Sequence, residues 1–184
     1  MCYESLSKLA TLRNILGGLA VTVVLLAVMG IWLTPEMQAI SGGLTILDMR
    51  IGYTTSDVLE LFTALGSEGL ALYSILQVID MLFPLTYAST MTFAMIYLSP
   101  DLLKEKRFTK IVFFFPLIAA AFDYLENVLI ATQIAAFPAL SELAIVVAST
   151  VTWLKWMFLF MAFILLIIFL ILAMSPSKVK PKNQ

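Results

Sequence analysis

The feature that most constrains this chain is a set of four apolar stretches, each long enough to cross a membrane as a helix. A helix that spans the hydrocarbon core needs roughly 20 predominantly apolar residues. The stretches cover residues 15–33, 70–98, 111–137 and 143–174. Only 12% of the chain is charged, against about 25% in a soluble domain, so it has too little polar surface for a water-soluble fold. The sequence therefore predicts an all-α integral membrane protein, a four-helix transmembrane bundle.

The remaining residues are expected to serve this bundle rather than to form a second domain. We expect residues 1–174 to be one membrane domain and residues 175–184 to be a disordered cytoplasmic tail. The run at 15–33 is longer than the roughly 7–15 apolar residues of a signal-peptide core, so we expect a retained anchor.

A long outer segment, residues 34–69, connects the first two stretches. Its first half is expected to be irregular because it contains Pro35 and a glycine pair. Its second half is expected to form a short amphipathic helix, capped by Thr55 or Ser56 and ended by Gly66. The apolar face of this helix would consist of Val58, Leu61, Phe62 and Leu65. Such a helix would lie in the outer interface or cover the bundle.

Basic residues predict the orientation, because they are enriched in cytoplasmic loops. They precede the first stretch, fill the loop between the second and third, and follow the fourth, whereas the opposite side holds only Arg50 in its loops. The residues concerned are Lys8, Arg13, Lys104, Lys106, Arg107, Lys110, Lys178, Lys180 and Lys182. We therefore expect both termini to be cytoplasmic, in the plasma (inner) membrane.

Composition excludes several classes of site. Histidine is absent, which removes the usual proton shuttle and the commonest ligand of transition metals. A single cysteine, Cys2, excludes an intramolecular disulfide and a thiolate metal cluster. The net charge of −1 gives no indication of nucleic acid. We expect no cofactor, no metal site and no nucleic-acid partner; membrane lipid is the expected partner, with a homo-oligomer or a partner subunit left open.

Four ionisable side chains interrupt the last three stretches: Asp80, Asp123, Glu126 and Lys155. At about 1.5 Å per residue from the predicted cytoplasmic helix ends, all four fall in one layer of the outer half of the membrane. An isolated charge is costly there, whereas a paired charge is tolerated. The sequence therefore predicts a single polar cluster inside the bundle.

Neighbouring polar residues share the helix faces of these charges and complete a candidate ligand-binding set. That set is Gln77, Asp80, Tyr87, Asp123, Glu126, Asn127, Thr152 and Lys155. Ser74 is placed on the same face as Gln77. Pro84 has no N–H, so the backbone carbonyl of Asp80 loses its helical partner and must be satisfied by another group.

Three carboxylates and one ammonium leave an excess of negative charge in the cluster. A protonated carboxyl, Arg50 reaching in from the outer loop, or a bound cation would each relieve it. Lys155 has an alternative, because it could extend to the outer interface instead of pairing. A purely structural ion pair between the third and fourth stretches is a further interpretation that stays open.

Residues 80–87, Asp-Met-Leu-Phe-Pro-Leu-Thr-Tyr, give the chain a likeness to a known class. With four spans, cytoplasmic termini and buried acids, the chain resembles the emopamil-binding and sigma-2 receptor class of small membrane proteins. Members of that class bind sterol-like ligands, and some isomerise them. The resemblance implies a membrane pocket for a ligand of this kind and assigns no role to any single residue.

These observations lead to one functional hypothesis and two alternatives. The first is that the protein binds a small amphiphile or lipid, with the cluster recognising its polar end. The second is an intramembrane enzyme with isomerase- or hydrolase-type acid/base chemistry on a lipid-like substrate, for which Asp80, Asp123 and Glu126 are the catalytic candidates. The third is an accessory subunit of a larger membrane complex.

Overall fold

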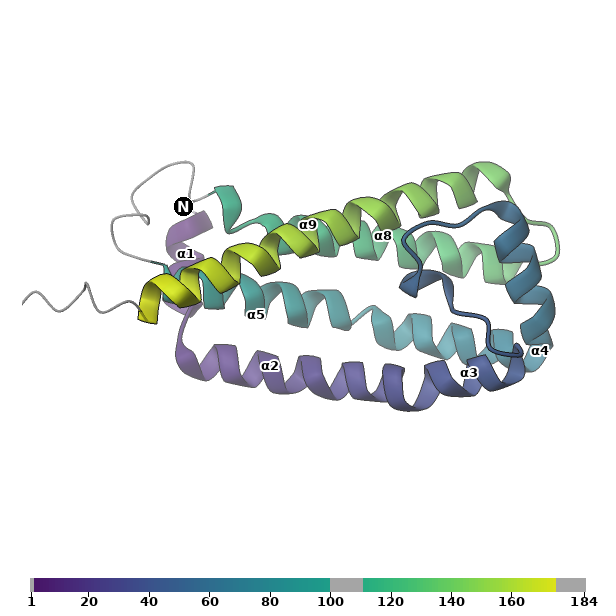
Figure 1. The fold of residues 1–184 in the computed structure, drawn as a ribbon, viewed down its shortest axis with the longest axis horizontal. Helices are drawn as coiled ribbons and strands as arrows, with labels where there is room; N and C mark the ends of the chain where they lie inside the picture. Colours follow the sequence, from purple (N-terminus) through teal and green to yellow (C-terminus); the bar gives the residue numbers. More distant parts are fainter. Residues whose placement is uncertain (1, 100–110, 175–184) are drawn as a thin grey trace, which may run out of the picture.

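The computed structural model describes residues 2–99 and 111–174, and within these ranges the chain is helical and contains no strand. The long helices run along the long axis of an elongated bundle, and the helical segment that begins at residue 55 crosses one end of it (Figure 1). The predicted basic loop around residues 104–110 and the predicted tail at 175–184 lie outside the described residues.

Four helical runs are long and apolar enough to cross a membrane, as the sequence predicts. The first run joins α2 (Leu12–Ala27), a π-helical segment η1 (Val28–Leu33) and α3 (Thr34–Ile40). The second joins α4 (Thr55–Asp80) and α5 (Phe83–Leu98), the third is α8 (Phe115–Ala136) and the fourth is α9 (Glu142–Met174). A short helix α1 (Cys2–Leu9) precedes them, and a 3₁₀ turn η2 (Leu47–Met49) lies between the first two runs.

Helix α5 is the centre of the bundle. It packs against α2 on one side and against α8 and α9 on the other, and α8 and α9 pack along each other (Figure 1). The colours in Figure 1 show that α5 and α8, which pack against each other, run in opposite directions. At the end of the molecule opposite the N-terminus, α4 packs against α3, α8 and α9 (Figure 1).

The first run is longer than predicted, because Pro35 does not end it. The helix continues to Ile40, so the predicted irregular chain begins at residue 41 rather than at residue 34. Pro35 stands in the first turn of α3, where its missing N–H is tolerated. In the preceding π-helical segment the Thr34 N–H donates to the Met29 carbonyl, which shifts the hydrogen-bond pattern just before the proline.

The chain after residue 54 is helical, but as the first part of α4 rather than as the separate short helix that the sequence predicts. Thr54, rather than Thr55 or Ser56, is its N-cap, and a capping box links Thr54 to Asp57. The four residues of its predicted apolar face are each at most 2% exposed: Val58, Leu61, Phe62 and Leu65. Gly66 has a φ of 57° and kinks the chain there, but the helix resumes and runs on to Asp80.

Residues 41–54, which we call the strap, lie against the bundle between α4 and α9. The Leu47 N–H donates to the Tyr73 hydroxyl of α4 over 3.1 Å. The Tyr53 N–H donates to the Ser149 hydroxyl of α9 over 2.9 Å. These hydrogen bonds hold the strap on both sides of Asp48; Ile46 and Leu47 are buried, Asp48 is half-buried, and Met49 is exposed.

Candidate functional site

Three of the four charged side chains predicted to cluster, Asp123, Glu126 and Lys155, meet between α8 and α9. The Lys155 Nζ atom lies 3.2 Å from Asp123 Oδ1 and 2.5 Å from Glu126 Oε2. The three residues are 6%, 4% and 0% exposed, respectively. Lys155 therefore pairs inside the bundle, and the alternative in which it extends to the interface is wrong.

Neutral hydroxyl groups extend this cluster in two directions. The Tyr87 hydroxyl of α5 donates to Asp123 Oδ2 over 3.1 Å. The Thr152 hydroxyl donates to Glu126 Oε1 over 2.6 Å and lies 3.4 Å from the Tyr53 hydroxyl of the strap. Burial raises the pKa of the Tyr53 hydroxyl well above its usual range, so this group stays a neutral hydrogen-bonding partner. The contacts therefore run continuously from α5 through α8 and α9 to the strap.

The Asp80 backbone carbonyl, which lacks a helical partner because Pro84 has no N–H, accepts a side-chain hydrogen bond. The helix breaks after Asp80, and α5 begins at Phe83 with the proline in its first turn. The Asn127 side-chain amide of α8 lies 3.4 Å from the Asp80 carbonyl oxygen and donates to it. This confirms the prediction that another group must satisfy the carbonyl, and it gives fully buried Asn127 a structural role.

The structure adds an acid that the sequence did not place, Asp48 of η2. Its carboxylate accepts hydrogen bonds from the Tyr73 hydroxyl at 2.6 Å and from the Gln77 amide at 3.0 Å. Gln77 is buried, as expected, but it contacts the strap rather than the charged cluster. Ser74 lines a second pocket together with Gln77, but it is exposed, and its hydroxyl donates to the Leu70 carbonyl rather than to the charged cluster.

Arg50 does not relieve the excess of negative charge in the cluster. Its guanidinium donates twice to the Thr45 carbonyl, over 2.9 and 2.7 Å. Its remaining contact is with Asp57, at 3.8 Å. Four carboxylates and one ammonium, rather than the three carboxylates counted from sequence, therefore meet in this part of the bundle.

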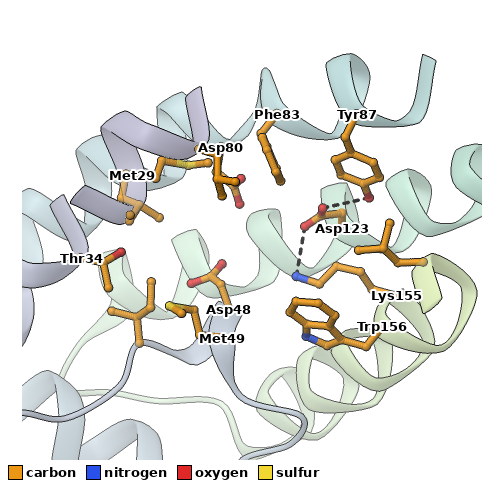
Figure 2. Close-up of a pocket in the computed structure, with 15 residues that line it drawn as sticks. Met29, Thr34, Asp48, Met49, Asp80, Phe83, Tyr87, Asp123, Lys155 and Trp156 are labelled. Carbon is orange, nitrogen blue, oxygen red and sulfur yellow. Dashed lines mark hydrogen bonds and ion pairs between the residues drawn. The ribbon is translucent and has the colours of Figure 1, made fainter. Parts of the chain in front are cut away.

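A cavity of about 210 Å³ lies beside these groups. Figure 2 shows Asp48 and Asp80 facing it from opposite sides, with Asp123 and the Lys155 ammonium at one end. The Trp156 ring lies beside the ammonium, with its centroid 5.6 Å from Nζ. Most of the wall is apolar; it consists of Leu26, Met29, Gly30, Ile46, Met49, Leu76, Phe83, Trp156 and Leu159, with Thr34 and Tyr87 as neutral polar residues.

The cavity separates the candidate ligand-binding residues into two groups. Asp80, Tyr87, Asp123 and Lys155 line it. The other four candidates lie outside its lining. Gln77 donates to Asp48 of the strap, Asn127 donates to the Asp80 carbonyl, and Thr152 donates to Glu126.

The cavity lies between the first helical run and α9, at the flank of the bundle. Its rim includes residues from both sides, and several of them are exposed: Leu26 at 55%, Met49 at 58% and Trp156 at 40%. In the first run, the π-helical segment contributes Met29 and Gly30 to the wall. An apolar molecule could therefore reach the cavity from the side of the bundle.

The acids do not form a metal centre. Within residues 2–99 and 111–174, no group of three or more His, Cys, Asp or Glu side chains is arranged to hold a metal ion. The chemistry that the site offers is hydrogen bonding and charge pairing in an apolar enclosure.

No known protein family, curated protein or solved structure is significantly similar to this chain. The site must therefore be interpreted from its own geometry.

Proposed function

We propose that this protein resides in a membrane and binds a small amphiphile or lipid, with the polar end of the ligand at the buried carboxylates. The observation that carries the proposal is the character of the cavity. Its walls are apolar, and it ends on charged groups that are more than nine-tenths buried. Pockets of this composition bind molecules with an apolar body and few polar groups.

The orientation supports access from the outer leaflet. Lys8 precedes the first helical run and Arg13 lies in its first turn, and basic residues at this end of the first span support a cytoplasmic N-terminus. The strap and residues 55–65 then lie at the outer end of the bundle, where the helix capped by Thr54 covers it. On this basis we assign the protein to the plasma (inner) membrane, with both termini cytoplasmic and with the cavity opening to the outer leaflet.

An intramembrane enzyme is the second candidate, and one observation favours it. Asp80 and Asp123 line the same cavity, so two carboxyls face whatever binds there. Acid/base chemistry would require these carboxyls to differ in proton affinity while both contact the substrate. An accessory subunit is a third candidate, which stoichiometric co-purification of a partner would favour.

The binding proposal is tested with a neutral probe and a variant that fills the cavity. Trp156 lines the cavity, and the other two tryptophans, Trp32 and Trp153, are more than half exposed. Replacing those two by Phe leaves Trp156 as the only tryptophan, whose fluorescence reports on the cavity. The protein is placed in phosphatidylcholine nanodiscs and titrated with a long-chain alcohol that carries bromine, which quenches tryptophan on contact. Binding in the cavity gives saturable quenching, whereas partition into lipid gives a linear response.

Two glycines of the first helical run provide a matched pair of variants. Gly30 lines the cavity, and an added Cβ at this position has no atom within 4 Å, so Gly30→Phe adds bulk without a backbone clash. Gly17 has equally open surroundings but does not line the cavity. We expect Gly30→Phe to abolish the saturable phase and Gly17→Phe to retain it. Equal quenching in both variants would mean that the probe does not occupy this cavity.

A further inference from the structure

The cavity carries more acidic than basic side chains, and its one base is already engaged. Asp48, Asp80 and Asp123 face it together with Lys155. The Lys155 ammonium pairs with Asp123 and also with Glu126, which lies outside the lining. One ammonium thus pairs with two carboxylates, Asp123 and Glu126, and does not pair with Asp48 or Asp80.

Within residues 2–99 and 111–174, no basic side chain forms an ion pair with Asp48 or Asp80. The nearest base in the sequence, Arg50, is held by the Thr45 carbonyl and Asp57. Asp80 is buried and Asp48 is half-buried, and two carboxylates that face one apolar cavity without a counter-ion are costly in a low-dielectric medium. A positive charge brought by a ligand would offset that cost.

Both carboxylates are positioned for such a ligand. The Asp48 carboxylate is fixed by the Tyr73 hydroxyl and the Gln77 amide, which are both neutral donors. Asp80 is 6% exposed, ends α4, and directs its side chain into the cavity from the opposite wall (Figure 2). A group between these walls meets carboxylate oxygens on two sides.

From this geometry we propose that the ligand is an amphiphile with a cationic, N–H-bearing head group, which binds between Asp48 and Asp80. This inference rests on the proposed function and narrows its ligand class. An ammonium group carries several donors and one positive charge, which suits two acceptor-only carboxylates. The apolar part of the ligand lies along the wall formed by Met29, Met49 and Leu76 toward the flank of the bundle.

The proposal also makes the strap part of the binding site. Asp48 belongs to the strap and Asp80 to α4, so a bound cation bridges two elements that otherwise meet through hydrogen bonds of Tyr73 and Gln77. Recognition is assigned to this pair of acids, and the Lys155 cluster forms the end wall of the cavity.

The experiment compares three brominated probes with the same chain: a primary amine, an alcohol and a carboxylate. Each is titrated against the protein with Trp156 as its only tryptophan, in zwitterionic phosphatidylcholine nanodiscs. We expect the amine to bind at least about tenfold more tightly than the alcohol, since one charge-assisted hydrogen bond is worth a factor of this order. The carboxylate should bind more weakly than the alcohol, because it adds a like charge to the cavity.

Variants then locate the head group. Asp80→Asn and Asp48→Asn should each lower the affinity for the amine about tenfold or more, with little change for the alcohol. Glu68→Gln removes an exposed carboxylate from the same helix as Asp80 and should change neither affinity. If Asp80→Asn fails to fold, Asp48→Asn alone decides the question, because Asp48 lies on the strap rather than in a helix core.

The outcomes separate the two proposals. Saturable binding of the alcohol with no preference for the amine would overturn the cationic head group and leave the amphiphile site standing. An amine preference that survives both Asp48→Asn and Asp80→Asn would overturn the assignment to this pair. Absence of saturable quenching by every probe would overturn both proposals together.

Discussion

Replacing Lys155 by Met tests whether the buried cluster holds α8 and α9 together. The substitution keeps a long, flexible side chain but removes the ammonium that lies 3.2 Å from Asp123 and 2.5 Å from Glu126. Both carboxylates are at most 4% exposed, so they would stay buried without a counter-ion. Breaking a buried ion pair on one side costs about 3–5 kcal/mol. Because two carboxylates lose their partner here, we expect a loss at the upper end of that range.

The measurement is the free energy of unfolding in mixed micelles, followed by circular dichroism during titration with a denaturing detergent. Lys8→Met is the matched control, because Lys8 is exposed on α1 and its replacement should change stability by less than about 0.5 kcal/mol. A triple variant, Lys155→Met with Asp123→Asn and Glu126→Gln, removes the stranded charges as well and should recover at least half of the loss. A Lys155→Met variant that matches the control would refute the argument that the cluster is a paired, buried unit.

Two further predictions concern helix packing and the break between α4 and α5. A Cβ on Gly18 of α2 would clash with the Thr90 hydroxyl oxygen of α5, so Gly18→Val should cost about 1–3 kcal/mol in the same unfolding assay. Gly17→Val, with no atom within 4 Å of the new Cβ, should cost much less. Equal losses would refute close packing of α2 on α5 at this point. Asn127→Leu removes the donor to the Asp80 carbonyl and should cost about 1–3 kcal/mol. Adding Pro84→Ala restores a backbone N–H four residues after Asp80, which can bond the same carbonyl and should recover part of that loss. Strictly additive effects of the two changes would contradict the argument that both groups act on the Asp80 carbonyl.

The positions of the spans were predictable because membrane-crossing helices are recognised by length and composition. Helix α9 begins within one residue of the predicted start at 143 and includes the predicted end at 174. The ends near Pro35 and Gly66 were not predictable in the same way. A proline is compatible with either a helix end or a first turn, and a glycine with either a stop or a kink, and the packing of the neighbouring residues decides between these outcomes.

The meeting of Lys155 with Asp123 and Glu126 was also predictable, since lone charges in hydrocarbon require partners. Tyr73 could have been found as well, because Tyr73, Gln77 and Asp80 follow at spacings of four and three residues and therefore share a helix face. Asp48 could not. Its place depends on the path of the strap, which is set by tertiary hydrogen bonds such as that from Leu47 to Tyr73 rather than by any local pattern.

The acids of this bundle fall into two groups with different physical roles, and this division explains how one cluster can be both structural and functional. Glu126 is fully buried and absent from the cavity wall. It forms an ion pair with Lys155 and accepts a hydrogen bond from Thr152, both on α9, so it holds α8 to α9. Asp48 and Asp80 have no basic partner within residues 2–99 and 111–174 and face the cavity. Neutralising Lys155 should therefore act mainly on stability, and neutralising Asp48 or Asp80 mainly on the affinity for a cationic probe. Asp123 belongs to both groups, because it pairs with Lys155 and also lines the cavity. A cation bound in the cavity would therefore act on the α8–α9 ion pair through Asp123.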